Sequence, residues 1–158
     1  MKSYTADICD KYNNQVQVLD PFYKSFGGVA MCHGEIYTME LFEDNTALVE
    51  LLRDTKGENR ICVVDVKGNY CAVVGENLMK YAYENNWAGI VINGYVRDTH
   101  ETLQIPVGLF ALGTYPHKST KKAEANQQID LTFGGVLFKA GDTLYADSDG
   151  IIVSTMKI

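Results

Sequence analysis

The sequence has no long apolar run of the kind that a membrane span or a secretory signal requires. A span needs about 18 consecutive apolar residues, and residues 1–7 include Lys2 and Asp7 without an apolar core. Proline is scarce, at 3 of 158 residues, and no low-complexity linker divides the chain. We therefore expect a cytoplasmic protein with no membrane contact and a single domain over residues 1–158.

Basic residues and paired cysteines are also scarce. With 14 basic and 20 acidic residues the formal net charge is -6, which disfavours direct nucleic-acid binding because phosphate neutralisation needs a basic surface. The one basic cluster, residues 117–122, is interpreted as a solvated loop, with an anion-binding or partner-binding patch as the alternative.

The four cysteines have no CxxC spacing, so they form neither a zinc pattern nor a disulfide framework. We predict that they are small buried apolar residues. Cys32 and His33 are adjacent on a predicted strand and would point to opposite faces, which disfavours a nucleophilic pair.

Alternating helix and strand patterns predict an α/β fold, namely a compact α/β sandwich with a partly parallel central sheet and a β-rich C-terminal third. Helices are expected at 6–12 (capped by Thr5), 46–53 (capped by 43–45) and 77–87. Strands are expected at 29–33, 35–39, 60–65, 70–74, 89–92, 106–113, 129–133, 135–138, 143–146 and 150–153.

Two local patterns have a structural and a functional interpretation. Met79, Tyr83 and Trp87 recur at every fourth position, which favours a helix face packed on the core over a cofactor site. Residues 147–150 resemble part of a calcium loop, but a hairpin turn is favoured because the later glutamate of such a loop is missing and a strand follows.

The most informative segment is 75–98. The strand at 70–74 and the strand at 89–92 flank a crossover helix, so they should be parallel and end at the same edge of a sheet. Gly75-Glu76 and Arg97-Asp98, each just past a strand end, should therefore converge. Open α/β sheets usually bind their ligands at that edge.

The residue types at this point suit a small anion held against a metal. The amides of Glu76, Asn77 and Leu78 in the first helical turn can donate to a carboxylate, and Gly75 allows close approach. Arg97 offers a bidentate fork, while Glu76 and Asp98 supply oxygen ligands for Mg²⁺ or Mn²⁺. A 2-oxo acid fits, with the metal as Lewis acid for decarboxylase or retro-aldol chemistry. The alternative is an ordinary helix-dipole interaction beside an unrelated Arg-Asp pair.

The chain resembles the RraA family, which contains regulators of ribonuclease E activity and metal-dependent 4-hydroxy-4-methyl-2-oxoglutarate aldolases. The resemblance covers nearly the whole chain. The segments that carry it are 7–10 (DICD), 26–28 (FGG), 42–45 (FEDN), 75–78 (GENL), 87–91 (WAGIV), 94–98 (GYVRD), 132–136 (TFGGV), 145–147 (YAD) and 150–153 (GIIV).

The resemblance implies specific roles for the site. In the family's enzymes an acidic residue, twenty intervening residues and Arg-Asp form the metal and substrate motif, which here is Glu76, residues 77–96 and Arg97-Asp98. It implies that Asp98 ligates the divalent ion, that Arg97 binds the 2-oxo acid, and that the backbone of 75–78 cradles its carboxylate. It also implies a compact α/β sandwich and a homotrimer with sites near subunit boundaries.

Two departures from the family's enzymes bear on activity. The acidic position is often Asp and here is Glu76, and the characterised aldolases have a C-terminal extension with a further acidic residue, whereas this sequence stops at Ile158. Oxaloacetate decarboxylation, which needs fewer proton-handling groups, is the favoured activity. His100 could donate a proton, although a surface histidine is favoured.

Two other functions remain open. The first is a protein-binding inhibitor of ribonuclease E, with which an acidic protein is compatible. The second is a passive anion site that retains the pocket without chemistry.

Overall fold

The computed structural model describes residues 4–120 and 124–158, so Lys121 and Lys122 of the basic cluster lie outside the described residues. The helices are α1 (Thr5–Tyr12), α2 (Thr46–Asp54), α3 (Glu76–Glu84) and α4 (Thr99–Thr102), with a 3-10 turn at Asn13–Gln15. The strands are β1 (Val16–Val18), β2 (Lys24–Ser25), β3 (Cys32–Leu41), β4 (Ile61–Asp65), β5 (Ala72–Val74), β6 (Gly89–Val96), β7 (Gly108–Thr114), β8 (Ala125–Gln127), β9 (Leu131–Phe133), β10 (Val136–Phe138), β11 (Thr143–Asp147) and β12 (Gly150–Ser154).

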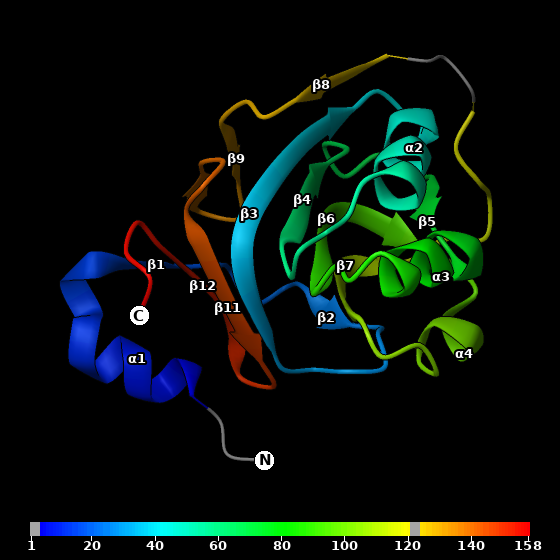
Figure 1. The fold of residues 1–158 in the computed structure, drawn as a ribbon. Coiled ribbons are helices and arrows are strands. Elements are labelled where there is room, and N and C mark those ends of the chain that lie inside the picture. The colour runs from blue at the N-terminus through cyan, green and yellow to red at the C-terminus, as the bar shows by residue number, and fades with distance from the viewer. Residues whose placement is uncertain (1–3, 121–123) are drawn as a thin grey trace.

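Most strands of the described residues belong to one mixed sheet, in the order β1-β12-β11-β3-β4-β6-β7-β2, with β5 beside β6 and β8 beside β3 (Figure 1). The centre is parallel, since β4 pairs with β3 and β6, and β6 pairs with β7, all in the same direction. The flanks, including β11 and β12, are antiparallel. The predicted α/β class, partly parallel sheet and β-rich C-terminal third are confirmed.

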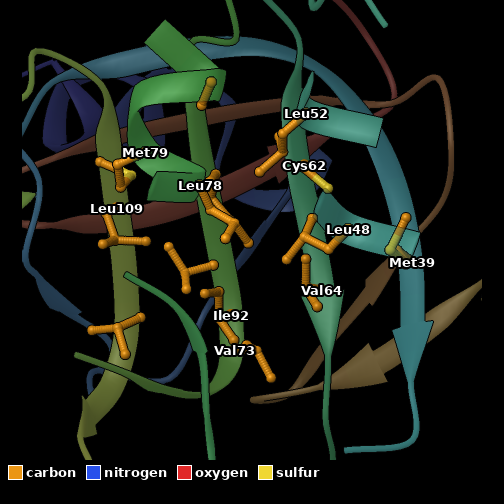
Figure 2. Close-up of a cluster of buried hydrophobic side chains, with 14 of the residues drawn as sticks. Met39, Leu48, Leu52, Cys62, Val64, Val73, Leu78, Met79, Ile92 and Leu109 are labelled. Carbon is orange, nitrogen blue, oxygen red and sulfur yellow. The ribbon is translucent and has the colours of Figure 1, made fainter. Parts of the chain in front are cut away.

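Both faces of the central strands are covered, which explains their continuous apolar sequences. Along β4, Cys62 and Val64 belong to the core beneath α2 and α3, whereas Ile61 and Val63 belong to the core shared with the C-terminal strands. This alternation follows from the two-residue period of a strand. Figure 2 shows the first core, where side chains of α2 and α3 meet those of the sheet. Full burial of such side chains is the main stabilising contribution.

The helices are short. The structure gives α2 and α3 nine residues each, and no helix within the described ranges is long and apolar enough to cross a membrane. The cap residue of α2 is Asn45, within the predicted segment 43–45, but its side chain makes no capping hydrogen bond. Asp44, one residue earlier, accepts hydrogen bonds at its Oδ1 from the amide and hydroxyl of Thr46, the first helical residue, at 2.8 and 2.6 Å.

The prediction of two strands at 29–33 and 35–39 was wrong, because one strand, β3, runs through Gly34. A side chain at position 34 would collide with the carbonyl group of Asn59. The glycine therefore permits a close approach of backbone and does not mark a turn. Elsewhere the predicted strands differ from the structure mainly at their ends, most of all β6, which extends to Val96.

The predicted helix at 77–87 was too long, and one residue of its stripe was misassigned. α3 ends at Glu84, and Asn86 has a left-handed backbone conformation with φ 58°. Met79 and Trp87 are buried as predicted, but Tyr83 is 55 % exposed. The buried face of α3 consists of Leu78, Met79 and Ala82. Trp87 lies beyond the end of the helix and is not part of this face.

The predicted turn at 147–150 is a hairpin joining β11 to β12, and it also holds the first helix. The Asp147 carboxylate accepts hydrogen bonds from the Tyr4 and Thr5 amides, both at 2.8 Å, and from the Thr5 hydroxyl at 2.7 Å. Thr5 is thus the first residue of α1 and not its cap. Two of the amides at the start of the helix, those of Tyr4 and Thr5, are thus bound from a distant strand.

Candidate functional site

The two loops expected to converge do meet. β5 and β6 are parallel, with Val74 opposite Val96. The next residue, Arg97, donates its amide to the Val74 carbonyl at 3.0 Å. The Asp98 carboxylate then accepts a hydrogen bond from the Glu76 amide at 3.1 Å. The prediction that Gly75-Glu76 and Arg97-Asp98 lie together at one edge of the sheet is confirmed.

Gly75 is required by this contact. A Cβ atom at position 75 would lie 2.5 Å from Asp98 Oδ2 and 3.5 Å from Arg97 Cγ. Asp98 itself has a left-handed conformation, with φ 56°, and its carbonyl accepts the Glu101 and Thr102 amides at 3.0 and 2.9 Å as α4 begins. The carboxylate is therefore fixed through its backbone on one side and by the α3 amide on the other.

A pocket of about 510 Å³ surrounds these residues. All the predicted site residues line it: Gly75, Glu76, Asn77, Leu78, Arg97 and Asp98. A segment of the basic cluster, 117–120, also lines the pocket, together with Asn45 from the start of α2. The sequence favours a solvated loop for this cluster and predicts Asn45 only as part of a helix cap, so neither is expected at the site.

Long-range backbone pairing brings 117–120 to the site. The Ala72 amide donates to the His117 carbonyl at 2.7 Å, and the Ser119 amide donates to the Ala72 carbonyl at 3.1 Å. Lys118 is therefore paired in parallel with Ala72 on β5. Asn45 supports the same strand, because its Nδ2 donates to the Val73 carbonyl at 2.8 Å. No local sequence motif predicts either the pairing of 117–119 with Ala72 or the hydrogen bond from Asn45 to Val73.

The anion-binding end of α3 differs from the prediction in one respect. The Glu76 amide, expected to donate to a ligand, donates to Asp98. Asn77 and Leu78, also in the first turn, line the pocket, and amides in the first turn of a helix have no partner within the helix. The Glu76 carboxylate forms a partly exposed ion pair with Lys80 at 3.0 Å.

Arg97 is half-buried at the pocket wall. Its Nη1 lies 3.4 Å from the Pro116 carbonyl oxygen, a long hydrogen bond that occupies one of five guanidinium N–H donors. This contact directs the side chain toward the wall formed by the segment after Pro116. A planar fork in that position suits bidentate binding of a carboxylate.

The carboxylates of this pocket match a hard divalent cation. Among the described residues, no group of three or more His, Cys, Asp and Glu side chains is placed to hold a metal. Mg²⁺, however, is commonly bound through one or two carboxylates and completes its shell with water and substrate. Asp98 and Glu76 are two such carboxylates in one pocket, so the residues present fit Mg²⁺ or Mn²⁺.

The other sequence candidates lie away from the pocket. His100 is exposed on α4, and the surface interpretation is confirmed. None of the four cysteines forms a disulfide; Cys62 and Cys71 are buried as predicted, whereas Cys9 and Cys32 are only half-buried. Burial raises the pKa of the Cys32 thiol to about 12. His33 stacks on Tyr145, with ring centroids 5.7 Å apart, which agrees with the prediction that Cys32 and His33 are not a catalytic pair.

Comparison with known proteins adds family information to this geometry. The family model described as RraA-like, Aldolase/RraA, matches residues 5–153. A protein of Alkalilimnicola ehrlichii is 43% identical over 151 residues, which are 95% of this chain and 93% of that protein. One of Laribacter hongkongensis is 44% identical over 155 residues, 98% of this chain and 97% of that protein. Both are named "Putative 4-hydroxy-4-methyl-2-oxoglutarate aldolase".

Two solved structures are similar over the whole chain, each with a TM-score of 0.94. One is named as an S-adenosylmethionine: 2-dimethylmenaquinone methyltransferase from Geobacillus kaustophilus, with 38% identity and 97% of that chain covered. The other is named as the RNA-processing inhibitor RraA from Thermus thermophilis, with 36% identity and 96% covered. The names of these relatives span an aldolase, a methyltransferase and an inhibitor.

Proposed function

The chain belongs to the RraA-like family, and we propose that it is a divalent-metal-dependent carbon–carbon lyase acting on 2-oxo acids. The favoured reaction is decarboxylation of oxaloacetate, with cleavage of 4-hydroxy-4-methyl-2-oxoglutarate, giving pyruvate, as the related aldolase activity. One observation carries the proposal: the Asp98 carboxylate, Arg97 and the first turn of α3 line a single pocket.

Each residue of the site has a separate role in this proposal. Asp98 would hold Mg²⁺ or Mn²⁺, with Glu76 as a second ligand directly or through water. The ion, when bound, supplies Lewis acidity toward developing negative charge on the keto oxygen. Arg97 and the amides of Asn77 and Leu78 bind and orient the carboxylate next to the keto group. In oxaloacetate the bond from C3 to the distal carboxyl group then breaks, carbon dioxide leaves, and C3 takes a proton to give pyruvate.

The charges of the pocket suit an anionic substrate held against a metal ion. Arg97 and Lys118 line the pocket together with the carboxylates of Glu76 and Asp98, and the first turn of α3 adds the positive end of the helix dipole. The cationic groups can attract the carboxylate of a 2-oxo acid, while the carboxylates can hold a divalent ion. A 2-oxo acid bound with a metal therefore matches both signs of charge in the pocket.

Pyruvate release from oxaloacetate tests the lyase proposal. With Mg²⁺ and a metal-only blank subtracted, the unaltered protein should release pyruvate, and removal of the metal by chelation should abolish the enzymic rate. Asp98→Asn and Arg97→Met should each lower kcat/KM by about a hundredfold or more, because each removes a group that stabilises charge. Asp130→Asn, an exposed carboxylate elsewhere, is the control. A rate that neither chelation nor these substitutions reduce would contradict the proposal.

A second candidate function is inhibition of an RNA-processing enzyme by protein binding. The observation that favours it is the likeness to the inhibitor of Thermus thermophilis, together with a net charge of -6 that would attract basic, RNA-binding segments of ribonuclease E. A pull-down with ribonuclease E at low salt is the test. Binding that weakens with added salt supports this role, and no binding at low salt opposes it.

A further inference from the structure

The pocket has a second cationic side chain that the lyase proposal does not use. Lys118 lines the pocket and is exposed, and hydrogen bonds on both sides of it, at His117 and Ser119, tie its backbone to Ala72. Its main chain is therefore fixed while its long aliphatic stem leaves the ammonium group adjustable. His117 beside it packs toward the ring of Tyr115, with centroids 6.3 Å apart.

Lys118 and the first turn of α3 lie beside different positions of the chain segment 72–75, and both line the pocket. Lys118 pairs with Ala72, and Gly75 lies three residues further along, which is about 10 Å of parallel strand. A lysine side chain can span part of this interval, and a substrate with a carboxylate at each end can span the remainder. Lys118 also lines a smaller neighbouring hollow with Tyr70 and Tyr115, so it lies on the wall between two open spaces.

We propose that Lys118 binds the second carboxylate of a dicarboxylic 2-oxo acid and so makes the site selective for dicarboxylates over monocarboxylates. The inference rests on the proposed function, in which Arg97 and the first turn of α3 bind the carboxylate next to the keto group. The Lys118 ammonium, in the same pocket, then binds the carboxylate at the far end of the substrate as a point charge. Lys118 is a specificity-determining residue in this account. In 4-hydroxy-4-methyl-2-oxoglutarate the carboxylate that it binds lies beyond the bond that breaks. In oxaloacetate that carboxyl group is the one that leaves as carbon dioxide, so Lys118 holds the substrate only before the bond breaks.

Two ligands of equal length separate this role from catalysis. 2-Oxoglutarate and 2-oxopentanoate have the same five-carbon chain and differ at the far end, which is a carboxylate in one and a methyl group in the other. Neither has the β-carboxylate or the 4-hydroxyl group that decarboxylation or retro-aldol cleavage needs. Their dissociation constants can therefore be measured by titration calorimetry with saturating Mg²⁺.

The unaltered protein should bind 2-oxoglutarate about tenfold more tightly than 2-oxopentanoate, the range of one charge-assisted contact. Lys118→Met should bring the ratio close to one and leave 2-oxopentanoate binding unchanged. Lys139→Met, which removes an equal charge from an exposed position outside the pocket, should keep the original ratio. Arg97→Met should weaken both ligands.

The outcomes distinguish the inference from the function on which it rests. A protein with no preference for 2-oxoglutarate, or a Lys118→Met variant that retains the preference, overturns the role of Lys118 even if oxaloacetate is decarboxylated. A preference that Lys118→Met removes, in a protein without activity on oxaloacetate, supports the role and contradicts the lyase. If neither ligand binds the unaltered protein, the role of Lys118 fails, and the lyase fails with it only if oxaloacetate is not decarboxylated either.

Discussion

The site leaves no room for a side chain between residue 75 and Asp98, and this can be tested with a single methyl group. Gly75→Ala would place Cβ 2.5 Å from Asp98 Oδ2, so the carboxylate has to move away from the Glu76 amide. We expect pyruvate release from oxaloacetate to fall about tenfold or more, because displacement of a metal-site group by a fraction of an ångström has effects of that order.

A matched glycine shows whether the loss is local. Gly113→Ala, on β7, would bring Cβ no closer than 3.5 Å to the ring of Tyr95, which is ordinary van der Waals contact. That variant should keep its activity. Equal activity of Gly75→Ala and the unaltered protein would show that the contact between position 75 and Asp98 is not needed.

The chemistry of individual site residues was predictable where it depended on neighbours in the chain, and not where it depended on distant ones. Glu76, Arg97 and Asp98 follow strand ends, so parallel pairing alone places them together. The position of Lys118 depends instead on hydrogen bonds to Ala72, 46 positions earlier in the sequence. The use of the Glu76 amide by Asp98 depends on a side-chain position that spacing does not determine.

The first helix is held by one buried carboxylate, which makes its attachment sensitive to acid. Asp147 is 4% exposed and accepts hydrogen bonds from the Tyr4 amide, from the amide and hydroxyl of Thr5, and from the Asp149 amide. Burial alone would raise the pKa of Asp147, but these hydrogen bonds outweigh it and lower the pKa well below its ordinary value of 3.8.

The sign of the pH dependence follows from that lowered pKa. The ionised carboxylate stabilises the fold above the ordinary pKa, and its contribution is lost as the pH falls through the lower, folded-state value. At pH 7, Asp147→Asn should reduce the free energy of unfolding by about 1 to 3 kcal/mol, the cost of leaving buried donors unpaired. The difference should shrink below the ordinary pKa. Urea unfolding at several pH values measures it, with Asp130→Asn as the control, and a difference that does not change with pH would contradict this account.

Helices and strands were predictable where the spacing of apolar residues matched the 3.6-residue period of a helix or the two-residue period of a strand. β4 and the first half of β6 appear as short β-branched runs because each face packs on a different core. The end of α3 was not predictable from the same pattern, since Asn86 adopts a left-handed conformation while Trp87 remains buried in the core. Because Trp87 is buried although it follows the helix, the spacing of apolar residues in the sequence predicts a longer helix than the one that forms.

For the whole molecule, we expect the homotrimer that the family resemblance implies. Several large apolar side chains are exposed on the single chain, among them Val18 at 56%, Phe22 at 64% and Tyr70 at 70%. Burying some of them between copies would lower the free energy of the assembly. Light scattering coupled to size-exclusion chromatography should give three times the chain mass of 17.6 kDa. A mass of one chain at micromolar concentration would contradict the expectation.

The architecture as a whole was predictable to the level of layers and strand direction. Helical periods between apolar strands predict the parallel centre, and the run of short strands after β8 predicts the antiparallel flank. The order of strands, in which β12 and β11 lie between β1 and β3, was not predictable, because it depends on pairing between the two ends of the chain. That order also brings Asp147 to the start of α1.

The central claim is that one pocket holds a divalent ion and a 2-oxo acid between Asp98, Arg97 and the first turn of α3. A crystal structure of the protein with Mg²⁺ and pyruvate tests it most directly. We predict an ion about 2.1 Å from an Asp98 carboxylate oxygen, with the pyruvate carboxylate against Arg97 and the Asn77 and Leu78 amides. Crystals in which the ion and pyruvate are absent from this pocket at saturating concentrations, or bound elsewhere on the chain, would contradict it.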